Sequence, residues 1–289
     1  MRRLMLLLAV AGAVIALGLP PAGAIVDGEP DEDRHPSVGA LIGTVDGGST
    51  FSFVCSGSLL SDTEFLTAAH CSPWEMLGLT EENIFVTFDP DLVAADPFEW
   101  GFVGPVVRPT TVIPVTGKAV MPGYLLPAGG AMSRNDVAVI HLAGSASAAY
   151  PGIEPIVLPT AGALSEAAAH GGLARQSVTN VGYGFQSVST RNPTTPIAFN
   201  GLRMTSTSPI LGLTRDHLTT LENGRATGEG GVCMGDSGGP NFLGTAVGPN
   251  GTLQVSLNVG QGYHGCDAGI NSSQRLDLPS VLGFLAPFD

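Results

Sequence analysis

Positive charge is scarce in this chain. Of its 289 residues, 12 are Lys or Arg and 25 are Asp or Glu, so the formal net charge is −13, and Lys118 is the sole lysine. Nucleic-acid binding needs clustered Arg and Lys to neutralise phosphates, and anionic membrane surfaces attract the same residues. The composition therefore predicts no nucleic-acid partner and no binding to an anionic membrane.

Charged residues of either sign are also few. They make up 13% of the chain, whereas 44% is hydrophobic, which favours a buried core over a solvated coil. The 40 Gly and 22 Pro amount to about 21% of the residues, below the roughly 25–30% typical of low-complexity sequence. Disorder, collagen and coiled coil are excluded, and the length allows one or two domains.

Long apolar runs are absent beyond the first two dozen residues. There, two arginines precede an apolar run that ends at Leu19, and a small-residue cleavage pattern ends at Ala24. This arrangement is typical of a secretory signal peptide that is cleaved before Ile25. A membrane anchor is the alternative, and the run is near the lower length limit for one. We expect residues 1–24 to be removed and residues 25–289 to form a secreted protein, free of the membrane.

Cysteine is limited to four residues. An exported protein folds in an oxidising compartment, so four cysteines predict two disulfide bonds. Metal binding is the alternative, but the chain has no C-x-x-C spacing and its six His show no H-x-x-x-H spacing. We therefore expect no metal and no cofactor. Three pairings are possible, and counting alone does not choose among them. The four residues are Cys55, Cys71, Cys233 and Cys266.

Short strand-like segments recur along the chain, separated by turn residues such as Asn-Gly. With few helix signals, this pattern predicts an all-β protein built as an antiparallel barrel or sandwich. Two short helices are expected, over Leu164–Ala169 and over Leu278–Phe284. The expected strands are Val38–Val45, Phe51–Leu60, Glu64–Thr67, Ile84–Phe88, Val103–Val107, Val137–Leu142, Ile153–Leu158, Ser177–Gly182, Gly201–Thr207, Pro240–Gly244 and Gln254–Val259.

Three residues in local clusters are suited to acyl transfer. His70 follows an apolar strand, Asp136 stands at the mouth of another, and Ser237 lies in the segment Gly235–Pro240. A serine hydroxyl is a weak nucleophile unless a histidine takes its proton, and that histidine needs a buried carboxylate to fix its tautomer. Glycines beside the serine let backbone N–H groups converge on an oxyanion. Taken singly, the clusters also fit a packed histidine, a turn residue and a glycine-rich hairpin.

In the order His70, Asp136, Ser237, these clusters resemble the chymotrypsin-like (trypsin-fold) serine peptidases. The similarity extends along nearly the whole chain after residue 24. The further matching segments are Ile25–Gly28, like the family's mature N-terminus; Ile153–Pro159, like its inter-domain segment; Gly182–Gly184, where Gly-Trp-Gly is usual; Cys55 and Cys71, spaced like its histidine-loop disulfide; and Cys233 and Cys266, like the pair beside its specificity pocket.

The resemblance implies an all-β fold of two six-stranded antiparallel Greek-key barrels with a short C-terminal helix. The N-terminal barrel would span about residues 25–150 and the C-terminal barrel about 151–289. The active site would lie in the cleft between them. The implied disulfide bonds are Cys55–Cys71 and Cys233–Cys266.

The catalytic roles are implied in the same way. Ser237 would attack the scissile carbonyl, His70 would act as general base and later as acid, and Asp136 would orient His70. The backbone N–H groups of Gly235 and Ser237 would form the oxyanion hole.

The resemblance also implies an activation pair and a specificity pocket. In the family, the α-ammonium of the first residue forms an ion pair with the Asp that precedes the nucleophile. In this chain the corresponding pair would be Ile25 and Asp236. Residue 24 is Ala rather than Arg or Lys, so we expect signal-peptide cleavage itself to release the active N-terminus. Gly231 would form the pocket base, and its lack of charge predicts an uncharged P1 side chain, the one on the acyl side of the scissile bond. The other implied pocket residues are Val232, Ser256 and Asn258.

Together these inferences predict a secreted serine endopeptidase that acts on proteins or peptides as a monomer. Two alternatives stay open. An inactive homologue would bind through the same fold, although His70, Asp136, Ser237 and Gly235 are all present. A carbohydrate-binding β-protein would expose aromatic platforms, yet the chain has only two Trp and four Tyr.

Overall fold

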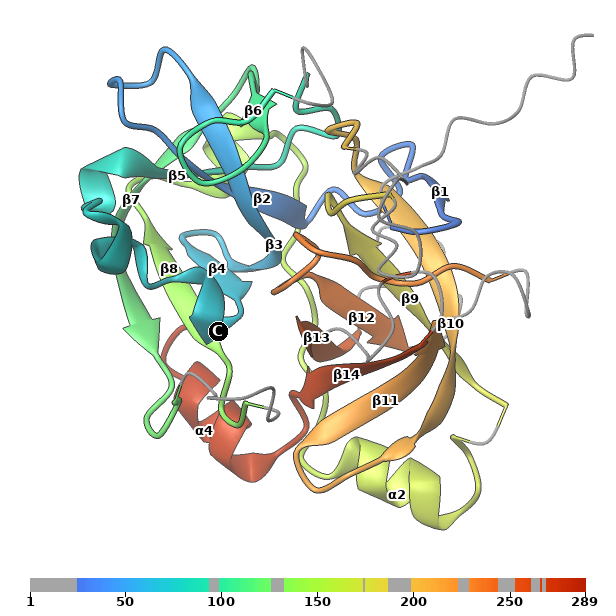
Figure 1. The fold of residues 1–289 in the computed structure, drawn as a ribbon. Helices are drawn as coiled ribbons and strands as arrows, with labels where there is room; N and C mark the ends of the chain where they lie inside the picture. Colours follow the sequence, from blue (N-terminus) through green and yellow to red (C-terminus); the bar gives the residue numbers. More distant parts are fainter. Residues whose placement is uncertain are drawn as a thin grey trace, which may run out of the picture.

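The computed structural model shows two closed β-barrels side by side (Figure 1). Each barrel has six antiparallel strands, and a short helix follows the last strand, so the predicted fold class is confirmed. The predicted signal peptide lies outside the described residues. The structure describes residues 25–93, 99–125, 133–173, 175–186, 199–222, 229–243, 253–260, 266 and 269–289.

The N-terminal barrel is closed in the order β2–β5–β7–β8–β4–β3, with β3 paired back to β2. Strands β2, β3 and β4 form a meander, and β5 returns to the far side of β2, which is the Greek-key arrangement. The short strand β6 pairs with the start of β3. The bounds are β2 (Val38–Gly43), β3 (Phe51–Ser61), β4 (Glu64–Thr67), β5 (Ile84–Thr87), β6 (Val106–Val107), β7 (Ile113–Val120) and β8 (Ala138–Leu142), with the 3-10 helices η1 (Ala69–Cys71), η2 (Trp74–Leu77) and η3 (Glu81–Asn83) between β4 and β5.

The C-terminal barrel repeats this topology in the order β9–β10–β11–β14–β13–β12, with β12 paired back to β9. The short strand β1 pairs with β10, so the beginning of the described chain is attached to this barrel. The bounds are β1 (Glu29–Pro30), β9 (Ser177–Gly182), β10 (Met204–Leu213), β11 (His217–Glu222), β12 (Pro240–Leu243), β13 (Gln254–Gly260) and β14 (Gly269–Arg275).

The two barrels differ in what fills them. The N-terminal barrel is packed with apolar side chains such as Phe65 and Ile140. The C-terminal barrel instead buries asparagines that bond to one another. The amide Nδ2 of Asn241 donates to Asn180 Oδ1 at 2.6 Å and to Asn258 Oδ1 at 3.0 Å. Such groups are tolerated inside a protein only when they are hydrogen-bonded, so these strands need the network as well as apolar packing.

A buried arginine joins the two barrels. The side chain of Arg203, just before β10, is fully buried and forms an ion pair with Asp31 at 3.0 Å. Its guanidinium also donates to the carbonyl oxygens of Val38 and Phe88 in the N-terminal barrel, both at 3.1 Å. Burial raises the pKa of Asp31, but hydrogen bonding to His35 and the charge of Arg203 outweigh it and hold that pKa low. The pair therefore stays charged and fixes the relative position of the barrels.

In the described part of the chain the α-helices are short: α1 (Ala146–Ala149), α2 (Ala163–Ala169) and α4 (Pro279–Leu285). Both predicted helices are confirmed, as α2 and α4. The chain end after α4 lies on the N-terminal barrel, where Ser61 Oγ donates to Phe288 O at 2.8 Å. No helix in the described part of the chain is long and apolar enough to cross a membrane.

One predicted strand is wrong. The segment Ile153–Leu158 belongs to no named strand and makes a single bridge, between Val157 and Leu253. The segment contains Pro155, which has no N–H for a strand ladder. It connects the barrels as an extended linker.

Candidate active site

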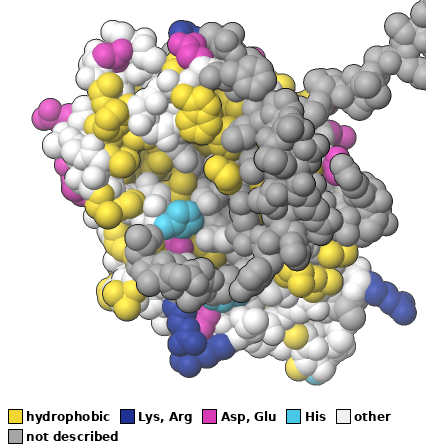
Figure 2. Space-filling view, viewed as in Figure 1, with side chains coloured by type: hydrophobic (Ala, Val, Ile, Leu, Met, Phe, Trp, Pro, Cys, Tyr) yellow, Lys and Arg dark blue, Asp and Glu magenta, His cyan; other side chains and the backbone are white. Residues whose placement is uncertain are grey.

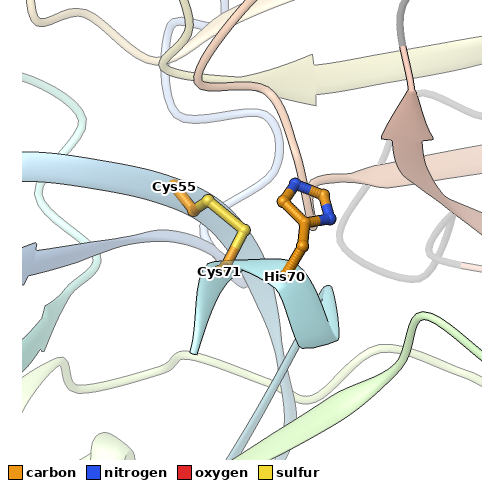
Figure 3. Close-up of side chains that lie close together, drawn as sticks. All are labelled: Cys55, His70 and Cys71. Atoms are coloured by element: carbon orange, nitrogen blue, oxygen red, sulfur yellow. A yellow bond between two sulfur atoms is a disulfide. The ribbon is translucent and has the colours of Figure 1, made fainter. Parts of the chain in front are cut away.

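His70 lies in the single turn η1, directly after β4. The next residue, Cys71, is bonded to Cys55 of β3, so this turn is fixed to the barrel wall beside the imidazole (Figure 3). These two sulfurs and the imidazole lie within 4.8 Å of one another, but the disulfide leaves no thiolate to bind a metal. The second disulfide joins Cys233 to Cys266, and both implied pairings are confirmed.

Asp136 holds one side of the imidazole. Its carboxylate, 1% exposed, accepts from the His70 backbone N–H at 2.9 Å and lies 2.9 Å from His70 Nδ1. Burial raises the pKa of Asp136, but the hydrogen bonds from His70 and Ser133 and the charge of His70 outweigh burial and lower it. The ionised carboxylate keeps the proton on Nδ1 and leaves Nε2 as the basic nitrogen.

Ser133 is a site residue that the sequence reasoning missed. Its hydroxyl donates to Asp136 Oδ2 at 2.6 Å from a buried position. The carbonyl of Ser133 accepts from His217 Nε2 of β11 at 2.8 Å. Burial lowers the pKa of His217, so this imidazole is neutral with its proton on Nε2. No local motif marks Ser133, because its role depends on a turn that only the fold defines.

Ser237 lies in a tight turn that contacts both barrels. Its carbonyl accepts from Ser56 N of β3 at 3.0 Å, and the next residue, Gly238, donates to Asn258 O of β13 at 2.8 Å. Gly238 has φ +80°, and a Cβ there would lie 2.0 Å from Thr67 Oγ1. Only glycine fits this contact. The turn of Ser237 is therefore packed against the segment that leads into His70.

The backbone before Ser237 leaves two N–H groups available. Within the described residues, the N–H groups of Gly235 and Ser237 have no hydrogen-bond partner. The carbonyl of Gly235 accepts from Ser56 Oγ at 3.0 Å, which fixes the orientation of the following peptide. Gly235 has φ +90°, and a Cβ there would lie 2.6 Å from the ring of Phe53. The turn thus presents preorganised donors, as stabilisation of an oxyanion requires.

Asp236 is a buried carboxylate without a cation. It is fully buried and accepts from the N–H groups of Cys233 and Gly184, both at 2.8 Å. Burial raises its pKa to about 7. Within the described residues it forms no ion pair. A Cβ on Gly182 or Gly184 would lie within 2.5 Å of this carboxylate, so glycines at both positions make room for it.

Ile25 and Val26 lie beside the segment that leads to Asp236. The side chain of Ile25 is fully buried against Met204. The carbonyl of Val26 accepts from Gly231 N at 3.0 Å, which forms an isolated antiparallel bridge. The beginning of the described chain therefore packs on the C-terminal barrel, against Met204 and Gly231.

The predicted pocket residues fall into two groups. Gly231 and Val232 are buried in the segment before Cys233. Ser256 and Asn258 are buried in β13, and their side chains bond to the asparagine network of the C-terminal barrel. These contacts direct both side chains into the barrel interior.

Glu222 lies against Gly231 and was not expected from the sequence. A Cβ on Gly231 would lie 2.8 Å from Glu222 Cγ, and Glu222 Oε1 accepts from Val232 N at 2.9 Å. Its Oε2 is buried without a hydrogen-bond partner among the described residues. Burial raises the pKa of Glu222 to about 8. The space that a side chain at position 231 would occupy is thus taken by the methylene carbons of Glu222, whose carboxyl group is mostly protonated at pH 7.

No family model matches this sequence, and no curated protein is significantly similar to it. The likeness to trypsin-like peptidases consists of the two-barrel shape and the two disulfides.

Proposed function

We propose that this protein is a secreted serine endopeptidase that hydrolyses peptide bonds through an acyl-enzyme on Ser237. The observation that carries the proposal is the buried, ionised Asp136, which holds Nδ1 of His70 at 2.9 Å. This arrangement makes Nε2 of His70 the base, and the Ser237 turn packs on the segment that carries His70. A buried carboxylate, an oriented histidine and a glycine-flanked serine together support nucleophilic catalysis.

In the proposed mechanism, His70 Nε2 takes the proton of Ser237 Oγ while that oxygen bonds to the scissile carbonyl carbon. The carbonyl oxygen becomes an oxyanion that accepts from the N–H groups of Gly235 and Ser237. The imidazolium, stabilised by Asp136, then gives its proton to the leaving amine, and the C–N bond breaks. A water molecule repeats the sequence, with His70 as base, and releases the acid and the free serine.

Export would also activate the enzyme. Cleavage between Ala24 and Ile25 would create an α-ammonium at the start of a segment that already lies beside Gly231. Asp236 is a buried carboxylate that has no cation beside it in the described part of the chain, and such a group gains most from a new positive charge nearby. We propose that Ile25 supplies this charge and thereby fixes the turn that carries the oxyanion donors.

The proposed P1 preference is for an uncharged side chain. Gly231 contributes no charge to the pocket base, and the adjacent Glu222 carboxyl is protonated at pH 7 because burial raises its pKa to about 8. A cationic P1 side chain would have to deprotonate this group before it gained a partner.

Labelling with a fluorophosphonate probe tests the proposed function. The secreted protein that begins at Ile25 is treated with the probe beside a Ser237→Ala variant, and mass spectrometry locates the adduct. We expect one adduct, on Ser237, and none in the variant. If the folded protein with this N-terminus takes no label, the triad is not functional, and the inactive homologue becomes the better description.

A further inference from the structure

The turn that leads into Asp136 is held from both barrels. On the side of the N-terminal barrel, Asn135 Nδ2 donates to the carbonyl oxygen of Pro122, just after β7, at 2.9 Å. On the side of the C-terminal barrel, His217 Nε2 of β11 lies 2.8 Å from the carbonyl oxygen of Ser133. A backbone carbonyl only accepts hydrogen bonds, so His217 is the donor. The two barrels are therefore joined at this turn.

Ser133 connects this contact to the carboxylate. Its hydroxyl donates to Asp136 Oδ2 at 2.6 Å, and the same oxygen lies 2.9 Å from His70 Nδ1. A series of direct contacts thus leads from β11 to the imidazole. His217 is 6% exposed, Ser133 is 7% exposed and Asp136 is 1% exposed. Hydrogen bonds in such a buried setting are strong, and a group that loses its partner there is not compensated by water.

The imidazole of His217 is a fixed donor. His217 N donates to Thr214 Oγ1 at 2.9 Å, and Thr214 N donates back to His217 O at 2.8 Å, which closes the turn between β10 and β11. On the other side, His217 is paired with Gln274 of β14. Burial lowers the pKa of His217, so the ring is neutral at pH 7. The backbone and the charge of this residue are therefore set by the C-terminal barrel.

A second contact between the same segments lies at the surface. Basic and acidic side chains are gathered at the lower edge of the face drawn in Figure 2. Arg134 Nε forms an ion pair with Asp216 at 3.0 Å, but the side chain of Arg134 is 67% exposed. Water and salt screen such exposed pairs, so they contribute little. The buried bond from His217 is the contact that fixes the turn.

We propose that His217 is a positioning residue of the active site, which acts through Ser133 to fix Asp136. The C-terminal barrel thereby sets the orientation of the base on the N-terminal barrel, while it also contributes the strand β13 that holds the turn of the nucleophile. Such a contact matters because a misplacement of about 1 Å can reduce the rate roughly 100-fold. The inference rests on the proposed function, because it takes the imidazole held by Asp136 as the base.

Two replacements of His217 test the proposal. Leucine leaves the buried carbonyl of Ser133 without a donor, whereas the amide of glutamine can donate to that carbonyl as the imidazole does. With a chromogenic peptide amide as substrate, we expect His217→Leu to lower kcat about tenfold and to leave KM unchanged, since the contact orients the base and does not touch the substrate. His217→Gln should restore kcat to within about threefold of the unchanged enzyme.

A double-mutant cycle shows whether the effect passes through Ser133. Ser133→Ala removes the hydroxyl that contacts Asp136 but keeps the backbone carbonyl. In that background, His217→Leu should reduce kcat by less than about a further twofold, because its effect on the carboxylate is already lost. Arg134→Ala, which breaks only the surface ion pair, should reduce kcat by about twofold at most.

Loss of a histidine and loss of stability are controlled separately. His141→Leu removes a histidine of β8 that contacts Glu64 at 2.7 Å and not Ser133, and it should leave kcat unchanged. Urea unfolding of each variant shows that it is folded under the assay conditions. If His217→Leu does not fold, His217→Asn takes its place, because its amide is one methylene shorter than that of glutamine and does not reach the carbonyl.

Each outcome supports or overturns one statement. Labelling of Ser237 by the fluorophosphonate probe together with an unchanged kcat in His217→Leu overturns this inference and leaves the proposed function standing. Additive effects of His217→Leu and Ser133→Ala overturn it as well, and so does a Gln variant that is as impaired as the Leu variant. If the unchanged protein takes no label and hydrolyses no substrate, the proposed function is overturned, and this inference with it.

Discussion

Retaining one residue in front of Ile25 should destabilise the folded protein as pH rises toward neutrality. Asp236 is fully buried with no cation facing it among the described residues, and burial raises its pKa to about 7, against an ordinary value of 3.8. A difference of about three pKa units corresponds to about 4 kcal/mol, at 1.36 kcal/mol for each unit. If the α-ammonium of Ile25 faces this carboxylate, a chain that begins at Ile25 avoids most of that loss.

The direction of this pH dependence follows from the number of protons that Asp236 binds in the folded and unfolded states. Between about pH 4 and pH 7, Asp236 keeps its proton in the folded extended chain and loses it in the unfolded chain. The unfolded state then binds fewer protons than the folded state, so the free energy of unfolding falls as pH rises through this window. Below about pH 4 both states are protonated, and the contribution of Asp236 to stability is fully present.

Urea unfolding at about pH 4.5 and about pH 7.5 would measure the effect in two forms, one beginning at Ile25 and one beginning at Ala24. The pKa of Glu222 is also raised, to about 8, but both forms share that group, so it cancels in their difference. We expect the form with Ala24 to lose up to about 4 kcal/mol more between the two pH values. Asp236→Asn in this form should remove the extra loss.

The same pH dependence in both forms would refute the placement of the α-ammonium at Asp236. Fluorophosphonate labelling gives a separate check. If the form with Ala24 labels at Ser237 as fast as the form that begins at Ile25, the N-terminus has no part in forming the oxyanion hole.

Three further predictions concern residues around the site. Ser133→Ala should lower kcat/KM about ten- to hundredfold, since a hydrogen bond to a charged group contributes about 1.5–3 kcal/mol and Asp136 loses the donor at 2.6 Å. An unchanged kcat/KM would show that Ser133 has no positioning role. Above about pH 8, ionisation of Glu222 should increase kcat/KM for substrates with Lys at P1 relative to substrates with an uncharged P1 residue. Glu222→Gln should abolish this pH dependence. A Gln variant that keeps the pH dependence would show that another group titrates. Replacing Cys55 and Cys71 together by Ala should reduce the free energy of unfolding by about 2–5 kcal/mol. Urea unfolding of the form that begins at Ile25 measures this change. An unchanged free energy would show that the disulfide bond does not constrain the chain.

Most strands of the N-terminal barrel could be predicted from the sequence, because they combine apolar runs with glycine-rich turns, but β7 of this barrel and β11 of the other were not expected. Strand β14 could not be predicted, because its sequence is Gly-Ile-Asn-Ser-Ser-Gln-Arg and its buried residues include Asn271 and Ser273. The usual alternation of apolar and polar residues is inverted there: Ile270 is exposed and the asparagine is inside. Hydrophobic periodicity detects a strand only when its inward face is apolar.

The residues of the site also divide into those that a local sequence motif indicates and those that only the folded structure reveals. His70, Asp136 and Ser237 stand in local motifs whose residue types reflect their chemistry, so the sequence alone predicts them. Ser133 and Glu222 act through contacts with residues far along the chain or across a turn, such as the 2.9 Å bond from Val232 N to Glu222. Nothing near either residue in the sequence distinguishes it from a surface serine or glutamate.

The polar interior of the C-terminal barrel is hydrogen-bonded to the turn that carries Ser237. Asn258 bonds through its backbone to Gly238 N and Gly239 O, on the C-terminal side of Ser237. Its side-chain Oδ1 accepts from two asparagines and a serine of β12 and β14. An apolar replacement at this position would leave those three buried donors without an acceptor, at about 1–3 kcal/mol each. It would also loosen the strand that holds the turn. Because a buried network is stable only when its members are satisfied together, the asparagines of this barrel fix the register of β13, and β13 in turn fixes the turn that carries Ser237.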